Sequence, residues 1–243
     1  MLDGTRGWAL IAAAAILGGG LIGSAYIAAQ GLERFRMADR VVVVKGSAER
    51  DVSADLAIWP LRLVAASDAL DAGQAEITAA RTKIEQFLTA RGFQAEEMSV
   101  ERLEVTDTTA NAYQSNQAPA RFILGQTLTL RSEKVAAVVD AISHSGELVA
   151  QGVVLSPDAG APQFRFTGLN AIKPELIAEA TAEARRAAEQ FARDSGSAVG
   201  VIRDANQGVI QILPRDRDDA YAETQSVEKR VRVVTTVTYG LQD

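Results

Sequence analysis

Apolar residues recur at the spacing of an α-helix in three stretches of this 243-residue chain. The stretches are Ser67–Arg91, Glu133–Ser145 and Lys173–Ser195. Residues three and four apart lie on one face of a helix, so each stretch predicts a helix with one apolar side. The residues expected to face inward are Leu70, Ile77, Ala80, Ile84, Phe87 and Leu88; Val135, Val138, Val139 and Ile142; and Leu176, Ile177, Ala180, Ala184, Ala187, Ala188 and Phe191.

Alternating or β-branched runs between these helices predict strands. They are Val41–Val44, Asp55–Ala66, Met98–Thr106, Arg121–Arg131, Gly152–Ser156, Phe164–Phe166, Ala198–Arg203, Gly208–Leu213 and Val227–Leu241. Two polar stretches, Asp107–Ala120 and Pro214–Gln225, read as loops. Strands joined mostly in antiparallel pairs predict an α+β fold with largely antiparallel sheets and about three covering helices.

One long apolar segment precedes these elements. From Trp8 to Ala29 the chain has 22 residues without a charge, enough to span the roughly 30 Å hydrocarbon core of a bilayer. The segment is either a membrane helix or a long signal sequence, and Ile27-Ala28-Ala29 is a poor cleavage site, which favours a retained anchor. We therefore expect a transmembrane anchor at 1–30, a linker at 31–39 and one domain at 40–243.

The charges beside this segment bear on its orientation. Arg6 and the terminal amine precede it, whereas Arg34, Arg36 and Arg40 follow it, a balance that favours a cytoplasmic C-terminal domain by the positive-inside rule. Within it, Gly19 and Gly23 have the GxxxG spacing that lets two membrane helices approach closely, although glycine is also simply common in such helices.

Composition excludes several classes of function. The net charge is −6 and aromatic residues make up 5% of the chain, so neither a basic surface for phosphates nor a stacking platform for bases is expected, and we predict no nucleic-acid partner. The chain contains no cysteine, which excludes disulfides, thiolate nucleophiles and Cys-ligated metals.

Candidate chemistry is sparse. His144 is the only histidine and stands in a Ser-His-Ser-Gly sequence at the end of a predicted helix, where it could act as a general base or interact with the helix dipole. Asp216, Asp218 and Asp219 could hold calcium, but Arg215 and Arg217 oppose a cation there, which favours a solvated loop. No P-loop, dinucleotide fingerprint or Gly-x-Ser-x-Gly sequence occurs. We predict no catalytic residue, no cofactor and no metal.

Two segments resemble the SIMPL family. Val41–Leu61 is similar to the opening of that domain, in which a strand, a Gly-containing bend with small residues and a Pro- or Ala-Asp pair, here Ala54-Asp55, lead into a second strand. Phe164–Gly208 is similar to its later segment, a short strand followed by an Ala-rich helix, a Gly turn and a strand. The resemblance covers roughly 40–241, and Ala54 departs from it because many members have proline there.

The resemblance implies a bacterial envelope protein without an assigned catalytic activity, linked to envelope or oxidative stress, that self-associates. On this basis we predict a homo-oligomer, single-pass in the inner membrane, with its C-terminal domain in the periplasm and an envelope protein as a further partner. Two alternatives stay open. One is a periplasmic ligand-binding or adaptor module that uses the loops Asp107–Ala120 and Pro214–Gln225, and the other is a hydrolase built on His144.

Overall fold

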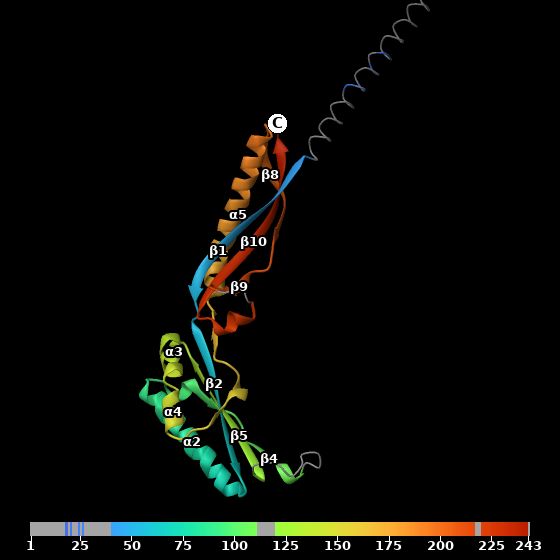
Figure 1. Ribbon diagram of the computed structural model, residues 1–243. Coiled ribbons are helices and arrows are strands. Elements are labelled where there is room, and N and C mark those ends of the chain that lie inside the picture. Colours follow the sequence, from blue (N-terminus) through green and yellow to red (C-terminus); the bar gives the residue numbers. More distant parts are fainter. Residues whose placement is uncertain are drawn as a thin grey trace, which may run out of the picture. The chain divides into compact units, whose positions relative to one another are not determined.

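A computed structural model describes residues 40–110, 120–216 and 220–242, together with Gly18, Gly20, Ser24 and Tyr26. Its fold is α+β with antiparallel sheets (Figure 1). The strands are β1 (Val41–Ser53), β2 (Leu56–Ser67), β3 (Met98–Val100), β4 (Glu104–Asp107), β5 (Phe122–Ser132), β6 (Leu155–Ser156), β7 (Gln163–Arg165), β8 (Ala198–Gln207), β9 (Gln211–Pro214) and β10 (Glu228–Gln242). The α-helices of residues 40–242, where described, are α2 (Leu70–Ala90), α3 (Val135–Ser143), α4 (Gly146–Ala150) and α5 (Leu169–Asp194).

The described chain forms two compact units. Unit 1 contains residues 40–48, Glu175–Val209 and 233–242, and unit 2 contains Glu49–Pro174 and Ile210–Arg232. The elements β1, β10 and α5 each contribute residues to both units.

Unit 2 is built on the pairing of β2 with β5, which runs without interruption from Ala57–Ser132 to Ser67–Phe122. β3 and β4 pair with the outer side of β5, and β6 and β7 pair with the outer side of β2. Pro60 falls between the residues of β2 that pair with β6 and those that pair with β7, so its missing N–H leaves no ladder bond unmade on that side.

Three helices cover one side of this sheet (Figure 1). Helix α2 packs on β2 and β5 because its apolar residues recur at helical spacing, and the same stripe forms the largest core of the molecule. The residues that α2 and β2 bury in it are Ile77, Ile84, Phe87 and Leu88, and Ala57, Trp59, Leu61, Leu63 and Ala65.

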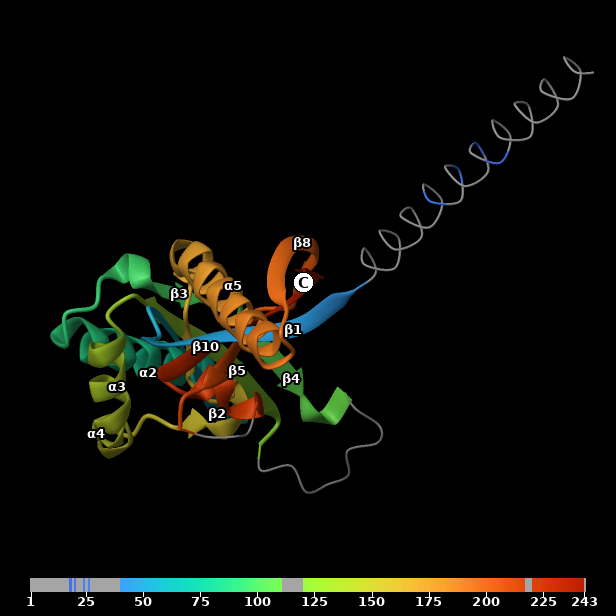
Figure 2. The same ribbon diagram turned by 90° about the horizontal axis from the view of Figure 1, so that it is seen from above.

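Unit 1 is a sheet in the order β1-β10-β8 with α5 against one face (Figure 2). Helix α5 buries a residue at every fourth position, and four of the five are alanines: Leu176, Ala180, Ala184, Ala188 and Ala192. Such short side chains let a helix lie close to a sheet, and Ala184 and Ala188 form one buried cluster with Val44, Val237 and Tyr239. At the closest point, Gly46 of β1 lies directly against the backbone of α5.

One prediction needs correction. Among the described residues, no helix is long and apolar enough to cross a membrane, which contradicts both the predicted transmembrane helix and the placement as a single-pass inner-membrane protein with a periplasmic domain. Helices α2 and α5 have the required length, but each carries charged residues along it. The segment Trp8–Ala29 itself lies outside the described residues apart from the four named above.

Several boundaries also differ from those predicted. Glu133–Ser145 is not one helix, because α3 ends at Ser143 and a separate α4 follows, so four helices replace the predicted three in the described chain. β1 continues nine residues beyond Val44, and Met98–Thr106 splits into β3 and β4. Phe191, expected to face inward, is 64% exposed, and Ala192 is buried instead.

Candidate functional site

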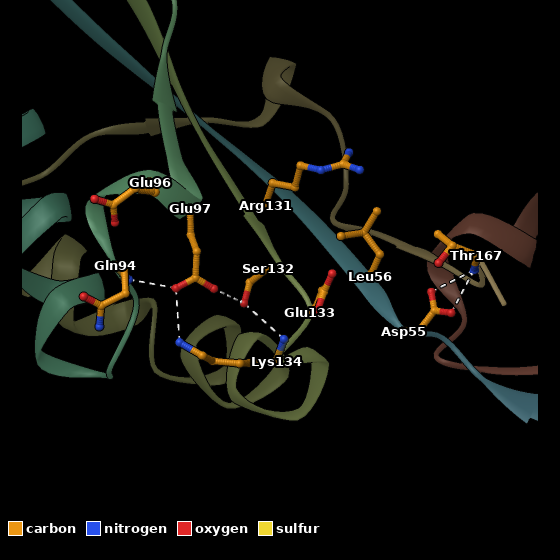
Figure 3. A pocket seen from close by; sticks show the side chains of 10 residues that line it. All are labelled: Asp55, Leu56, Gln94, Glu96, Glu97, Arg131, Ser132, Glu133, Lys134 and Thr167. Atoms are coloured by element: carbon orange, nitrogen blue, oxygen red, sulfur yellow. Dashed lines mark hydrogen bonds and ion pairs between the residues drawn. The ribbon is translucent and has the colours of Figure 1, made fainter.

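Unit 2 contains a pocket of about 670 Å³ whose lining residues are all polar or charged except Leu56 (Figure 3). It lies where the end of β5 meets the start of β2, the short helical turn Ala95–Glu97 and Thr167. Carboxylates and cations both line it, and we call it the polar pocket.

Glu97 is the centre of a hydrogen-bond network in this pocket (Figure 3). Its Oε1 accepts from the Ser132 hydroxyl at 2.5 Å, and its Oε2 accepts from the backbone N–H of Gln94 at 2.8 Å. The Lys134 ammonium lies 3.1 Å from Oε2 and also donates to the Gly92 carbonyl at 2.9 Å. The Lys134 amide in turn donates to the Ser132 hydroxyl at 3.1 Å. The network therefore ties the end of β5 to the turn before β3.

These contacts favour the ionised form of Glu97. The Ser132 hydroxyl, the Gln94 amide and the Lys134 ammonium hold the pKa of the Glu97 carboxyl below its ordinary value of 4.5, with the serine hydrogen bond as the largest cause. A carboxylate with a lowered pKa is a poor general base. Because Ser132 is also only 2% exposed, its hydroxyl is shielded from substrates, and the network does not form an activated serine nucleophile.

Asp55 lies at the other side of the pocket and holds the chain just before α5. Its Oδ1 accepts from the Thr167 amide at 2.7 Å, and its Oδ2 accepts from the Gly168 amide at 2.9 Å. These amides precede the first turn of α5, where N–H groups lack partners within the helix and a negative charge is favourable. Asp55 thus acts as a cap supplied from a distant part of the sequence.

Three further charged residues line the polar pocket: Glu96, Arg131 and Glu133. Both carboxylates and the guanidinium are solvent-exposed, so together they offer sites for a small polar ligand that carries both signs of charge. Over the described residues, no cluster of three or more His, Cys, Asp or Glu side chains could hold a metal ion.

His144 directly follows the last residue of α3, and the described contacts of its side chain all involve one ring nitrogen. Its Nδ1 lies 2.9 Å from the Asp140 carbonyl oxygen, 3.1 Å from the Ser143 hydroxyl and 3.5 Å from the Asp140 carboxylate. In a serine hydrolase triad, the nucleophile and the carboxylate sit on opposite nitrogens of the imidazole. Because serine and aspartate here share Nδ1, this arrangement cannot relay a proton between them.

The acidic loop is only partly described. Asp216 forms an ion pair with the neighbouring Arg215, with atoms 3.0 Å apart, and this pairing holds the pKa of the Asp216 carboxyl below its ordinary value. Asp218 and Asp219 lie outside the described residues, as does most of the predicted loop Asp107–Ala120.

Sequence reasoning missed the network of the polar pocket. Glu97 and Ser132 are far apart in the chain and belong to no local motif, so no periodicity or spacing marks them. Asp55 did stand out within the Ala54-Asp55 pair, but its distant partners could not be read from the sequence.

Comparison with known proteins gives one finding. The family model described as SIMPL, a protein of unknown function (DUF541), matches residues 42–239, which includes most of both units. No curated protein matches the chain.

Proposed function

Because the chain belongs to the SIMPL family, whose function is unknown, we propose that it is a non-enzymatic protein that self-associates into a larger assembly. The absence of catalysis is supported by geometry at its two best candidates. The Ser132 hydroxyl donates a hydrogen bond to the Glu97 carboxylate, whose pKa is lowered. His144 contacts both Ser143 and Asp140 through Nδ1.

The observation that carries self-association is the uncovered surface of unit 1. β1 begins with four consecutive valines, a pattern typical of a strand that is buried on both faces. Helix α5 covers only the face that contains Val44, while Val41 and Val43 on the other face are 45% and 61% exposed. A second copy of the chain would remove these valines from water.

The strand β8 adds an open edge to this surface. It pairs with β10 along one side and lies at the end of the sheet order, with most of its residues exposed. Val201 and Ile202 are among them, and an exposed edge strand is a template for pairing with another chain. Irregular register near these two residues bends the edge, so Asp204–Gln207 is the part suited to regular pairing.

The mass of the full-length particle tests this proposal. We expect light scattering or native mass spectrometry to give a multiple of the chain mass, and Val43→Lys combined with Ile202→Lys to lower it. Val149→Lys is the control, because Val149 lies on α4 in unit 2 and is about as exposed as Val43. A monomer at every concentration would contradict self-association.

A second candidate is a ligand-binding or adaptor module. It is supported by unit 2, where the polar pocket adjoins an apolar hollow that shares Glu133 and Lys134 with it. Surface concavities of this kind are typical of binding sites.

A further inference from the structure

Unit 2 contains an apolar groove along α3. Two hollows form it, one of about 910 Å³ and one of about 340 Å³, and both are lined by Val139 and Val227. Ala54 and Ala136 contribute to the first hollow, and Ile142 and Phe164 contribute to the second. We call the two together the α3 groove.

Helix α3 has more apolar surface than its own core uses. Val135, Val138 and Ala141 are buried, which accounts for one face of the helix. Ala136 and Val139 lie on a second face toward the groove, and Val139 is 41% exposed. A helix that is apolar on two faces normally packs against other groups on both. On the second face of α3, the described residues leave Ala136 and Val139 exposed to water.

The groove carries negative charge at the end near the start of α3. Glu133 lines both the groove and the polar pocket, and within the described residues it forms no ion pair. Lys134 beside it is held by Glu97 and the Gly92 carbonyl, so its charge is already matched. An occupant with an apolar body and a cation next to Glu133 would complement both features.

We propose that the α3 groove binds the apolar face of an amphipathic helix from a partner protein, with a basic residue of that helix against Glu133. Grooves of this type accept apolar side chains spaced three and four residues apart, one hollow for each anchor. The proposal rests on the adaptor function and not on self-association, since the groove and the uncovered surface of unit 1 have no residue in common.

The probe is a fluorescent amphipathic peptide of leucine and lysine, about 18 residues long, which gives roughly five helical turns. A scrambled peptide of the same composition has the same charge but no apolar face. Fluorescence anisotropy with the full-length protein should show saturable binding of the amphipathic peptide and at least about tenfold weaker binding of the scrambled one. Equal binding of the two peptides would overturn the proposal.

Two substitutions locate the binding. Val139→Asp should weaken binding of the amphipathic peptide by about tenfold or more. Val149→Asp places the same charge at a more exposed valine outside the groove and should leave the affinity for the peptide unchanged. Glu133→Gln should weaken binding of the amphipathic peptide by a smaller factor, and this factor should decrease at high salt. Glu76→Gln on α2 is the control, because it removes the same charge elsewhere.

The remaining outcomes are decided by the same variants. If Val139→Asp lowers the particle mass and leaves peptide binding intact, the groove belongs to a second copy and the proposal fails. If peptide binding is lost while the mass is unchanged, the groove is assigned to a partner. Loss of self-association in the unit 1 variants with normal peptide binding leaves the groove assignment standing.

Discussion

Gly46 shows how the absence of a single side chain can determine the packing of unit 1. A Cβ at this position would overlap the Ala180 carbonyl oxygen and the Ala184 amide nitrogen, and would lie 3.0 Å from the Ala184 Cα. The obstacles are backbone atoms, which cannot rotate away as a flexible side chain would. The helix and the strand must therefore separate to admit even one methyl group.

We expect Gly46→Ala to lower the free energy of unfolding by about 2 kcal/mol, the usual cost of overpacking. The neighbouring Ser47 points to the exposed side of β1, so Ser47→Ala serves as the control. Urea unfolding followed by circular dichroism measures both. A Gly46→Ala protein as stable as the Ser47→Ala protein would show that α5 is not packed as closely as described.

Glu97 predicts a pH dependence of stability. Its pKa is lower in the folded protein than in the unfolded chain, so the stabilisation it contributes is full above the ordinary value of 4.5 and is lost as the pH falls through the folded value. Glu97→Gln should therefore flatten the decline of stability below about pH 4.5. The difference is measured by the thermal unfolding midpoints of both proteins from about pH 3 to about pH 7, a range that includes the ordinary pKa values of carboxyl groups.

Ser132 contributes to the same network through a buried hydroxyl. We expect Ser132→Ala to cost about 1 to 2 kcal/mol, because the Glu97 carboxylate and the Lys134 amide each lose a partner. The same substitution should raise the pKa of Glu97, which carboxyl-detected NMR titration would record. An unchanged Glu97 pKa in this variant would contradict the assignment of the serine as the largest cause.

At the scale of elements, Asp55 couples the start of β2 to the start of α5. Asp55→Asn keeps the size of the side chain but removes its charge and leaves one oxygen to accept from Thr167 and Gly168. We expect a loss of about 1 kcal/mol, typical of a helix cap, and faster hydrogen exchange of those two amides. Unchanged exchange at both amides would show that the cap does not hold the helix end.

β1 and β10 are linked in unit 2 by ion pairs that the sequence pattern did not reveal. Arg230 lies 2.8 Å from Asp51, and Arg232 lies 3.3 Å from Glu49. The Arg230 guanidinium holds the pKa of the Asp51 carboxyl below its ordinary value. Arg230→Gln should therefore raise that pKa, with a smaller difference at high salt, as measured by NMR titration.

Prediction of the elements succeeded where local pattern decides the structure and failed where distant contacts decide it. The helix Ser67–Arg91 was predicted within a few residues of α2 because one amphipathic period decides it locally. β1 was predicted only as far as Val44, because the run of β-branched residues ends there and the family resemblance implies a Gly-containing bend after it. The partners of the following charged residues lie on β10, far away in the sequence. The prediction that Phe191 faces inward was wrong, because the buried residues of α5 recur at every fourth position and the next one after Ala188 is therefore Ala192.

At the scale of the whole molecule, the two units are not consecutive pieces of chain. Unit 1 is assembled from three segments and unit 2 from two, and the family match nevertheless runs as one stretch from 42 to 239. The α+β class followed from local patterns, but the division into units depends on which distant segments pair, and that information is absent from any one window of sequence. The polar pocket escaped prediction for the same reason.

The threading of the chain through both units also limits how such a protein can change over generations. The chain passes between the units at four points: Ala48 to Glu49, Pro174 to Glu175, Val209 to Ile210 and Arg232 to Val233. A genetic exchange that replaced one unit would need breakpoints at all four, three of which interrupt a strand or a helix. Recombination at one or two points therefore cannot exchange either unit by itself.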